Sequence, residues 1–173
     1  MTVEDRSPTE ETTLKVLGEK TLALVRIDSP PVNAGSVRVR SDLLDAFERL
    51  AGVDGLAGVV LVGSNGNFVA GSDMREFDAP PLAPHLPDVI AAIEALPVPV
   101  VAAIEGAALG GGFELALGCD ARIGAAENAT FGLPEVNVGR CGGAAHLGRH
   151  LPQGLLRQMF FTGRPIDAAE AYR

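Results

Sequence analysis

Three consecutive glycines at positions 110–112 constrain this chain more than any other feature of its sequence. Glycine disfavours a helix interior by about 1 kcal/mol relative to alanine. The run nevertheless joins an apolar, β-type segment at 98–104 to a helix-like segment that contains Glu114. We therefore expect the backbone to approach another group closely at this junction. Because N–H groups at a helix start stabilise negative charge and a carboxylate can transfer a proton, the junction predicts an enolate-forming site.

Length, composition and charge exclude several classes of protein. The 173 residues fit one domain with a substantial core, and 47% apolar with 21% charged residues is typical of a soluble globular chain. A net charge of −8 argues against nucleic-acid binding, which needs a basic surface, although local cations can still hold a phosphorylated small molecule. The sequence contains no apolar run long enough to predict a membrane-spanning segment. Two cysteines and the lack of a signal segment predict a reducing, cytoplasmic location without a disulfide framework.

The hydrophobic pattern alternates between strand and helix. Residues 1–12 are polar and acidic, which predicts a flexible tail before one domain at 13–173. Strands are predicted at 13–17 and 21–27, which form a hairpin, and at 58–62, 98–104, 120–124 and 130–131. Helices are predicted at 41–50, with Ser41 as N-cap, and at 87–96, 112–118, 142–151, 153–161 and 167–173. This order predicts an α/β fold with largely parallel strands. The chain stops inside its last predicted helix, which indicates a truncated product.

A second glycine-containing loop, residues 68–74, also follows a strand. It can present the Ser72 N–H at a turn into a helix. If this loop and the glycine run lie side by side, two N–H groups converge on one oxygen and form an oxyanion hole. The alternative is that both are ordinary strand–helix junctions, in which Asp73 only caps a helix and the glycines only allow close packing.

Two glutamates are candidate proton-transfer groups. Glu135 lies between apolar neighbours, which predicts partial burial and a raised pKa. Glu114 follows the glycines, where a carboxylate also favours the helix dipole without any chemistry. His85, His146 and His150 lack the spacing of a metal site, and no metal is expected.

Together and in this order, these residues resemble the crotonase (enoyl-CoA hydratase/isomerase) family. The resemblance runs from about residue 22 to 173, through the segments 31–33, 68–73, 99–106, 110–119 and 133–135. It implies a spiral of ββα units, assembled as a homotrimer or hexamer, from which most of the family's C-terminal helical region is missing.

The resemblance also implies a mechanism. The carbonyl of an acyl-CoA thioester would accept hydrogen bonds from the N–H groups of Ser72 and Gly111. Glu135 would exchange the α-carbon proton and Glu114 would activate water. Coenzyme A would lie along Ala70, Gly71, Ser72 and Asp73 as part of the substrate, with no further cofactor.

Retention of both glutamates favours an enoyl-CoA hydratase. The loop at 138–143 is shorter than in the family and lacks its usual proline, which leaves the reaction type open. The alternatives are a Δ3-Δ2 enoyl-CoA isomerase that uses Glu135 alone and an enzyme resembling carnitinyl-CoA dehydratases. Two further alternatives are a non-catalytic CoA-ester-binding or assembly protein and an unrelated nucleotide-binding α/β domain.

Overall fold

The computed structural model describes residues 11–17 and 20–173. Most of the predicted flexible tail, residues 1–10, and the turn at 18–19 lie outside the described residues, so both stay predictions. The first strand begins at Glu11, inside the segment predicted as tail.

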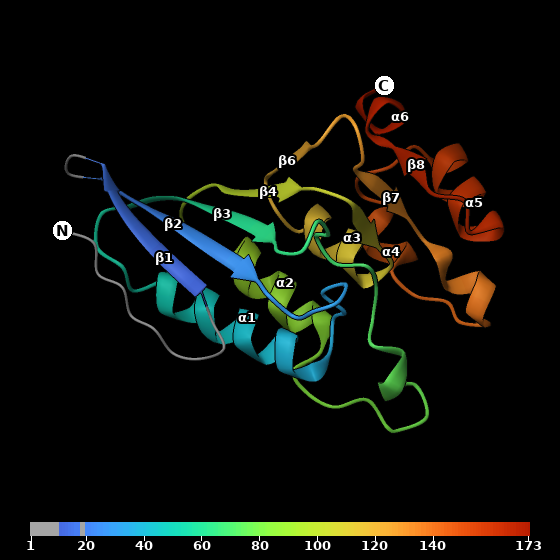
Figure 1. The fold of residues 1–173 in the computed structure, drawn as a ribbon, viewed down its shortest axis with the longest axis horizontal. Coiled ribbons are helices and arrows are strands. Elements are labelled where there is room, and N and C mark those ends of the chain that lie inside the picture. The colour runs from blue at the N-terminus through green and yellow to red at the C-terminus, as the bar shows by residue number, and fades with distance from the viewer. Residues whose placement is uncertain (1–10, 18–19) are drawn as a thin grey trace.

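The main sheet has five strands in the order β1-β2-β3-β4-β6 (Figure 1). Strands β1 (Glu11–Leu17) and β2 (Lys20–Ile27) pair antiparallel, as the predicted hairpin requires. Strands β3 (Leu56–Gly63), β4 (Val100–Ile104) and β6 (Ala121–Gly124) then follow in parallel with β2. The prediction of an α/β fold with largely parallel strands is confirmed for this sheet.

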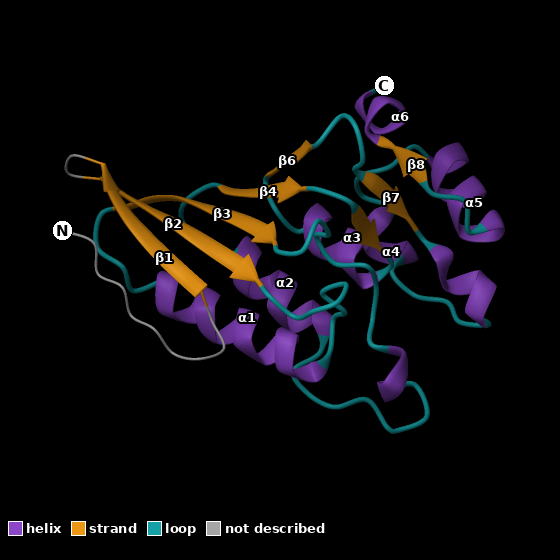
Figure 2. Cartoon of the chain, in the orientation of Figure 1, coloured by secondary structure: helices purple, strands orange, loops and turns teal. Residues whose placement is uncertain are grey.

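Helices α1 (Val37–Leu50) and α2 (Leu86–Glu94) cover one face of this sheet (Figure 2). The predicted N-cap of α1 is wrong by more than one turn. Ser36, in an extended conformation, caps the helix by accepting a hydrogen bond from the Val39 N–H at 3.3 Å. Ser41 therefore lies inside the helix, because an N-cap must have non-helical backbone angles.

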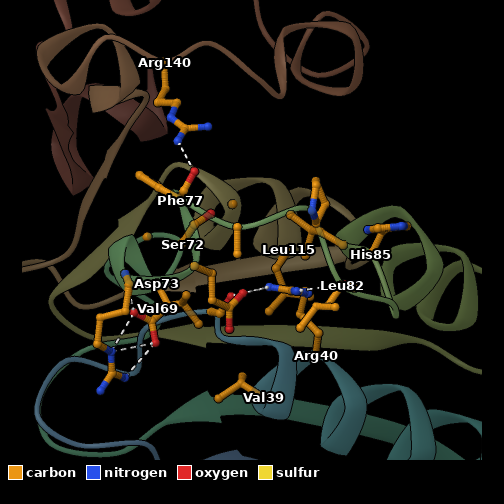
Figure 3. Close-up of a pocket in the computed structure, with 18 of the residues that line it drawn as sticks. Val39, Arg40, Val69, Ser72, Asp73, Phe77, Leu82, His85, Leu115 and Arg140 are labelled. Atoms are coloured by element: carbon orange, nitrogen blue, oxygen red, sulfur yellow. Dashed lines mark hydrogen bonds and ion pairs between the residues drawn. The ribbon is translucent and has the colours of Figure 1, made fainter.

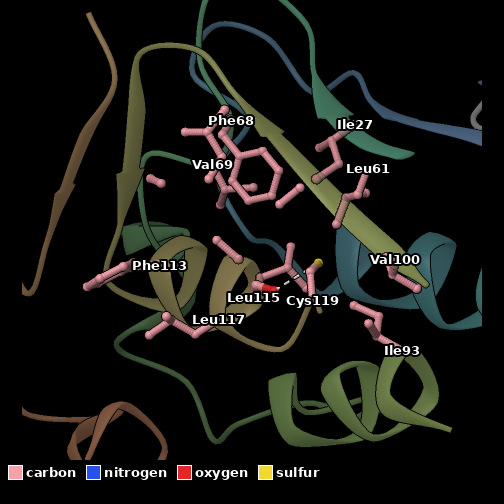
Figure 4. Packing of buried hydrophobic residues seen from close by; sticks show 14 of the residues in the cluster. Ile27, Leu61, Phe68, Val69, Ile93, Val100, Phe113, Leu115, Leu117 and Cys119 are labelled. Atoms are coloured by element: carbon pink, nitrogen blue, oxygen red, sulfur yellow. Dashed lines mark hydrogen bonds between the residues drawn. The ribbon is translucent and has the colours of Figure 1, made fainter. Parts of the chain in front are cut away.

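The core lies between the sheet and the helices (Figure 4). Leu61 and Val100 from the sheet, Ile93 from α2 and Phe68 from the loop after β3 are all buried. Complete burial of one such side chain contributes roughly 1.5–3 kcal/mol to folding. The regularly spaced apolar residues that predicted these elements are thus the residues whose burial stabilises the fold.

A second, three-stranded sheet has the order β5-β7-β8. Strands β5 (Ala107–Leu109) and β7 (Thr130–Gly132) are parallel, and β8 (Ile166–Asp167) is antiparallel to β7. Strands β5 and β8 were not predicted, because two or three residues carry no readable period.

The remaining helical segments are all shorter than α1. They are α3 (Gly111–Leu117), α4 (Ala144–Leu147), α5 (Gln153–Thr162), α6 (Ala168–Tyr172) and the 3-10 turns η1 (Met74–Glu76) and η2 (Pro134–Val138). Helix α5 was predicted almost to the residue. The helix predicted at 142–151 is wrong in length, since Gly143 has φ +70° and cannot continue a right-handed helix. Within the described ranges, no helix has the length and apolar character needed to cross a bilayer.

Candidate active site

The two glycine-containing loops lie side by side, as the sequence predicted. Val69 forms a parallel bridge with Ala108: its N–H donates to the Ala107 carbonyl, and its own carbonyl accepts from Leu109, both at 3.0 Å. The neighbour of the first loop is therefore β5 in the second sheet. The main sheet does not carry both loops, because the chain leaves β4 and turns at Gly106, with φ +60°, before it reaches the glycine run.

Close contacts require glycine at two positions of the run, and the third position shows which residue lies beside it. A Cβ on Gly112 would collide with the Val69 carbonyl oxygen, so α3 packs against the first loop at backbone contact. Gly110 has φ +53°, and a Cβ there would lie 2.5 Å from Glu135 Oε1. At Gly111 a Cβ would lie 3.4 Å from Ser72 Oγ, which places these two residues next to each other.

Ser72 and Gly111 line one cavity of about 450 Å³ (Figure 3). Its apolar wall includes Val69 from the first loop and Leu115 from α3. The lining is thus mainly apolar with a few charged side chains, among them Arg40, Glu76 and Arg140, which is the usual composition of a small-molecule site.

Not all of the residues predicted to bind coenzyme A line the cavity. Gly71, Ser72 and Asp73 line the cavity, whereas Ala70 is not among its lining residues. The Asp73 carboxylate is buried and bound to Arg75, with Oδ2 2.7 Å from Nη2. It also accepts the Arg75 N–H and caps η1, and the hydrogen bond from the Arg75 side chain lowers the pKa of Asp73. Its side chain is thus committed within the chain, and only its backbone faces a ligand freely.

The two glutamates approach the glycine run from different elements. Glu135 belongs to η2 and stands beside Gly110, while Glu114 belongs to the first turn of α3. Neither glutamate is among the residues that line the cavity. They stand instead around the glycine run, one of whose members, Gly111, forms part of the cavity wall.

Both carboxyl groups have raised pKa values. Burial and the neighbouring charge of Glu135 raise the pKa of Glu114 to about 7. Burial also raises the pKa of Glu135, which confirms the expectation from its apolar neighbours. Glu135 Oε2 is buried and has no hydrogen-bond partner among the residues that the structure describes. Since a buried polar atom without a partner is costly, this oxygen is available for a group that the chain itself does not supply.

The loop at 138–143 comes close to Glu114. A Cβ on Gly143 would lie 2.5 Å from Glu114 Oε1. The Gly142-Gly143 pair was visible in the sequence but was interpreted as a helix start. Sequence reasoning also missed Arg140 and Phe77, which line the cavity and contact each other. No local pattern identifies that pair, because its members are 63 residues apart.

Other reactive side chains do not extend this site. Cys119 is buried, and its burial raises the pKa of the thiol to about 12, so it does not supply a thiolate at neutral pH. Across the described part of the chain, no three His, Cys, Asp or Glu side chains gather as a metal site requires.

A largely parallel sheet joined to a smaller second sheet, with two glutamates at the glycine run, is the arrangement of the crotonase fold. The chain belongs to the enoyl-CoA hydratase/isomerase family, whose model matches residues 18–173. A peroxisomal bifunctional enzyme from Danio rerio is 44% identical over 160 residues, covering 91% of this chain and 22% of that protein. A probable enoyl-CoA hydratase from Bacillus subtilis is 37% identical, covering 87% and 62%.

Solved structures show the same fold. An enoyl-CoA hydratase/carnithine racemase from Magnetospirillum magneticum superposes with a TM-score of 0.83 at 27% identity, covering 96% of this chain and 66% of that one. The chain thus spans about two thirds of that structure and less than two thirds of the two relatives named above. The activity of these longer proteins is therefore only a proposal for this chain.

Proposed function

We propose that the chain adds water to a 2-enoyl-CoA thioester, or catalyses the reverse dehydration. The observation that carries this proposal is the pair of half-buried glutamates at the glycine run, where burial and then the charge of Glu135 raise the pKa of Glu114. Two carboxyl groups of raised pKa suit a reaction in which one orients water and the other transfers a proton near neutral pH.

In this mechanism the thioester carbonyl accepts hydrogen bonds from the backbone N–H groups of Ser72 and Gly111. These donors stabilise the enolate oxygen that forms when water attacks the β-carbon, and loss of one such donor typically lowers the rate about 10²–10³-fold. Glu114 orients the water and accepts its proton. Glu135, whose Oε2 has no partner among the described residues, delivers its proton to the α-carbon, and the proton taken up by Glu114 returns to Glu135 through solvent before the next turnover. The thioester and water are the only reactants, and coenzyme A is held along residues 70–73.

The names of several relatives agree with this chemistry. The Bacillus subtilis relative is a probable enoyl-CoA hydratase, and so is a mitochondrial relative from Arabidopsis thaliana that is 42% identical over 159 residues. Another relative, from Mycobacterium tuberculosis and 39% identical, is a hydrolase of a bicyclic CoA ester. The family therefore supports CoA-ester chemistry in general, and the paired glutamates support hydration within it.

The test is hydration of crotonyl-CoA by the purified chain, followed by loss of enoyl absorbance and by the mass of the hydroxyacyl product. Glu114→Gln and Glu135→Gln should each lower kcat by about 10²–10⁴, since each removes a proton-transfer group but keeps the shape of the side chain. Gly154→Ala, at a glycine with open space around it, is the matched control.

The same variants separate the alternatives. A Δ3-Δ2 isomerase that uses Glu135 alone would keep double-bond migration in Glu114→Gln and lose it in Glu135→Gln. An enzyme resembling carnitinyl-CoA dehydratases would act on the carnitinyl ester and leave crotonyl-CoA unchanged. Measurable binding of CoA esters without turnover of any ester would instead assign a binding or assembly role. Binding of NAD but not of acetyl-CoA would refute the CoA-ester proposal altogether.

We further propose a homotrimer or hexamer located in the cytoplasm. Sedimentation of the purified chain tests the assembly, and fractionation of the source cells tests the location. A monomer or a dimer would contradict the proposed assembly.

A further inference from the structure

Arg140 brings a positive charge to the cavity that the proposed reaction does not use. Two other arginines line the cavity, and both are paired: Arg40 lies 3.2 Å from Glu76, and Arg75 lies 2.7 Å from Asp73. Among the described lining residues, Arg140 is the one arginine without a carboxylate partner. The charged side chains around the cavity therefore leave one positive charge without a counter-charge.

The guanidinium of Arg140 is held in place before any ligand binds. Its Nη2 donates to the Phe77 carbonyl at 2.6 Å, and its central carbon lies 4.5 Å from the centroid of the Phe77 ring (Figure 3). A guanidinium has five N–H donors in a planar fork, so one bond to a carbonyl leaves four donors for a ligand. A fork that is already oriented loses less entropy when it binds an anion.

The backbone of Arg140 is fixed to the turn that carries Glu135, and its guanidinium reaches Phe77, four residues beyond Asp73. The Arg140 N–H donates to the Glu135 carbonyl at 2.9 Å, and Glu135 is the proposed α-carbon proton donor. Coenzyme A itself is assigned to residues 70–73, on the first loop. An anion that meets Arg140 is therefore expected to be part of the acyl group rather than of the nucleotide.

We propose that Arg140 binds a carboxylate at the far end of the acyl group, so that the preferred substrates are CoA monothioesters of unsaturated dicarboxylic acids. This inference rests on the proposed function, because it assumes that an acyl-CoA occupies the cavity. A carboxylate and a guanidinium form two parallel charge-assisted hydrogen bonds, and this geometry selects against acyl groups that end in a methyl.

The test measures binding of glutaryl-CoA, butyryl-CoA and free coenzyme A by calorimetry. Wild type should bind glutaryl-CoA roughly tenfold to a hundredfold more tightly than butyryl-CoA, the range expected for charged hydrogen bonds. Arg140→Leu should abolish this preference and leave butyryl-CoA binding nearly unchanged. Arg140→Lys should keep part of it, since lysine supplies the charge without the fork. Arg157→Leu, which removes an exposed arginine of α5, should keep it fully.

The other possible results distinguish a failure of the carboxylate subsite from a failure of the proposed function. Equal binding of glutaryl-CoA and butyryl-CoA by wild type refutes the carboxylate subsite and leaves the proposed function intact. A uniform loss for all three ligands in Arg140→Leu and Arg140→Lys assigns Arg140 to the coenzyme A phosphates or to loop structure, and also overturns the inference. If wild type binds none of the three, the proposed function fails and the inference fails with it. Phe77→Leu, which keeps the carbonyl acceptor, should retain the glutaryl preference.

Discussion

Asn33 joins three segments of the chain through one buried side chain. Its Nδ2 donates to the carbonyls of Ser64 and Asn67 at 2.8 Å each, and its Oδ1 accepts from the Ser29 N–H at 2.9 Å. The residue is completely buried and has φ +55°, a conformation that asparagine tolerates better than most residues. In the sequence, the Pro-Val-Asn segment counted only as part of a resemblance. The structure gives it a physical role in holding the loops that precede the site.

Asn33→Ala should lower the free energy of unfolding by about 2–4 kcal/mol. It removes partners from buried backbone groups, at roughly 1–3 kcal/mol, and it places alanine at a positive φ, at about 1 kcal/mol. Urea unfolding monitored by circular dichroism measures the change. Asn65→Ala is the control, because Asn65 has φ +59° but lies exposed and makes one side-chain bond, to Asp28. Equal losses in the two variants would show that backbone strain alone explains the effect.

For single residues, burial and pKa were easier to predict from the sequence than the residues that they contact. The apolar neighbours of Glu135 predicted its burial and raised pKa correctly, because both follow from local sequence. The roles of Glu114, Ser72 and Gly111 stay predictions, although the structure brings all three to the glycine run. The contact between Arg140 and Phe77 was beyond prediction, since it depends on how two distant loops fold over the cavity.

Among the elements, the junction between β5 and α3 shows why the glycine run is required. The predicted close approach is present, but it occurs after a strand that the sequence did not reveal. Strand β5 is three residues long and owes its extended form to pairing with β7, from which it is separated by about twenty residues. Longer elements such as β3 and α1 were predictable because each repeats its apolar period several times. Short elements are determined by their partners, which the local pattern does not contain.

Gly112→Ala should destabilise the protein by more than about 2 kcal/mol. The new Cβ would meet the Val69 carbonyl and side chain, so α3 must move away from the first loop, and overpacking of this kind typically costs 1–3 kcal/mol. The displacement should also lower hydration of crotonyl-CoA, because Gly111 moves with the helix. Chemical unfolding and initial rates measure the two effects.

Gly154→Ala is the comparison within a helix, since nothing lies within 4 Å of a Cβ at that position in α5. It should be neutral or stabilise the protein by about 0.5–1 kcal/mol, as replacement of glycine by alanine in an open helix does. A Gly112→Ala protein as stable and active as Gly154→Ala would contradict the close-packing explanation of the glycine run.

In the whole molecule, the ordered set of motifs identified the family before any pairing was known. The resemblance implied the fold, and the family match over residues 18–173 confirms it. The division into two sheets was not predicted, because it depends on the turn at Gly106 and on pairing between distant segments. That division is what positions the site: the first loop leaves the main sheet, the glycine run leaves the second, and the cavity takes walls from both.

The raised pKa values at the site should appear in the stability of the whole molecule. The pKa of Glu114 is about 7 in the folded protein, against an ordinary value of 4.5. A group whose pKa is raised on folding contributes stability below its unfolded pKa and loses that contribution as the pH rises through its folded pKa. Stability should therefore fall from about pH 4.5 to about pH 7, and the raised pKa of Glu135 acts in the same direction. Asp73, whose pKa is lowered, affects stability only in acid, below the usual range of its carboxyl group.

Glu114→Gln should reduce this loss of stability with rising pH. With allowance for the partial solvent access of Glu114, the loss in wild type is on the order of 2 kcal/mol, and the neutral amide abolishes most of it. Glu135→Gln should reduce the fall as well, because it removes the neighbouring charge that helps to raise the pKa of Glu114. Unfolding in urea at several pH values measures all three curves. If Glu114→Gln falls as steeply as wild type, the pKa of Glu114 is not raised in the folded protein, and the proton-transfer role proposed for this residue loses its physical basis.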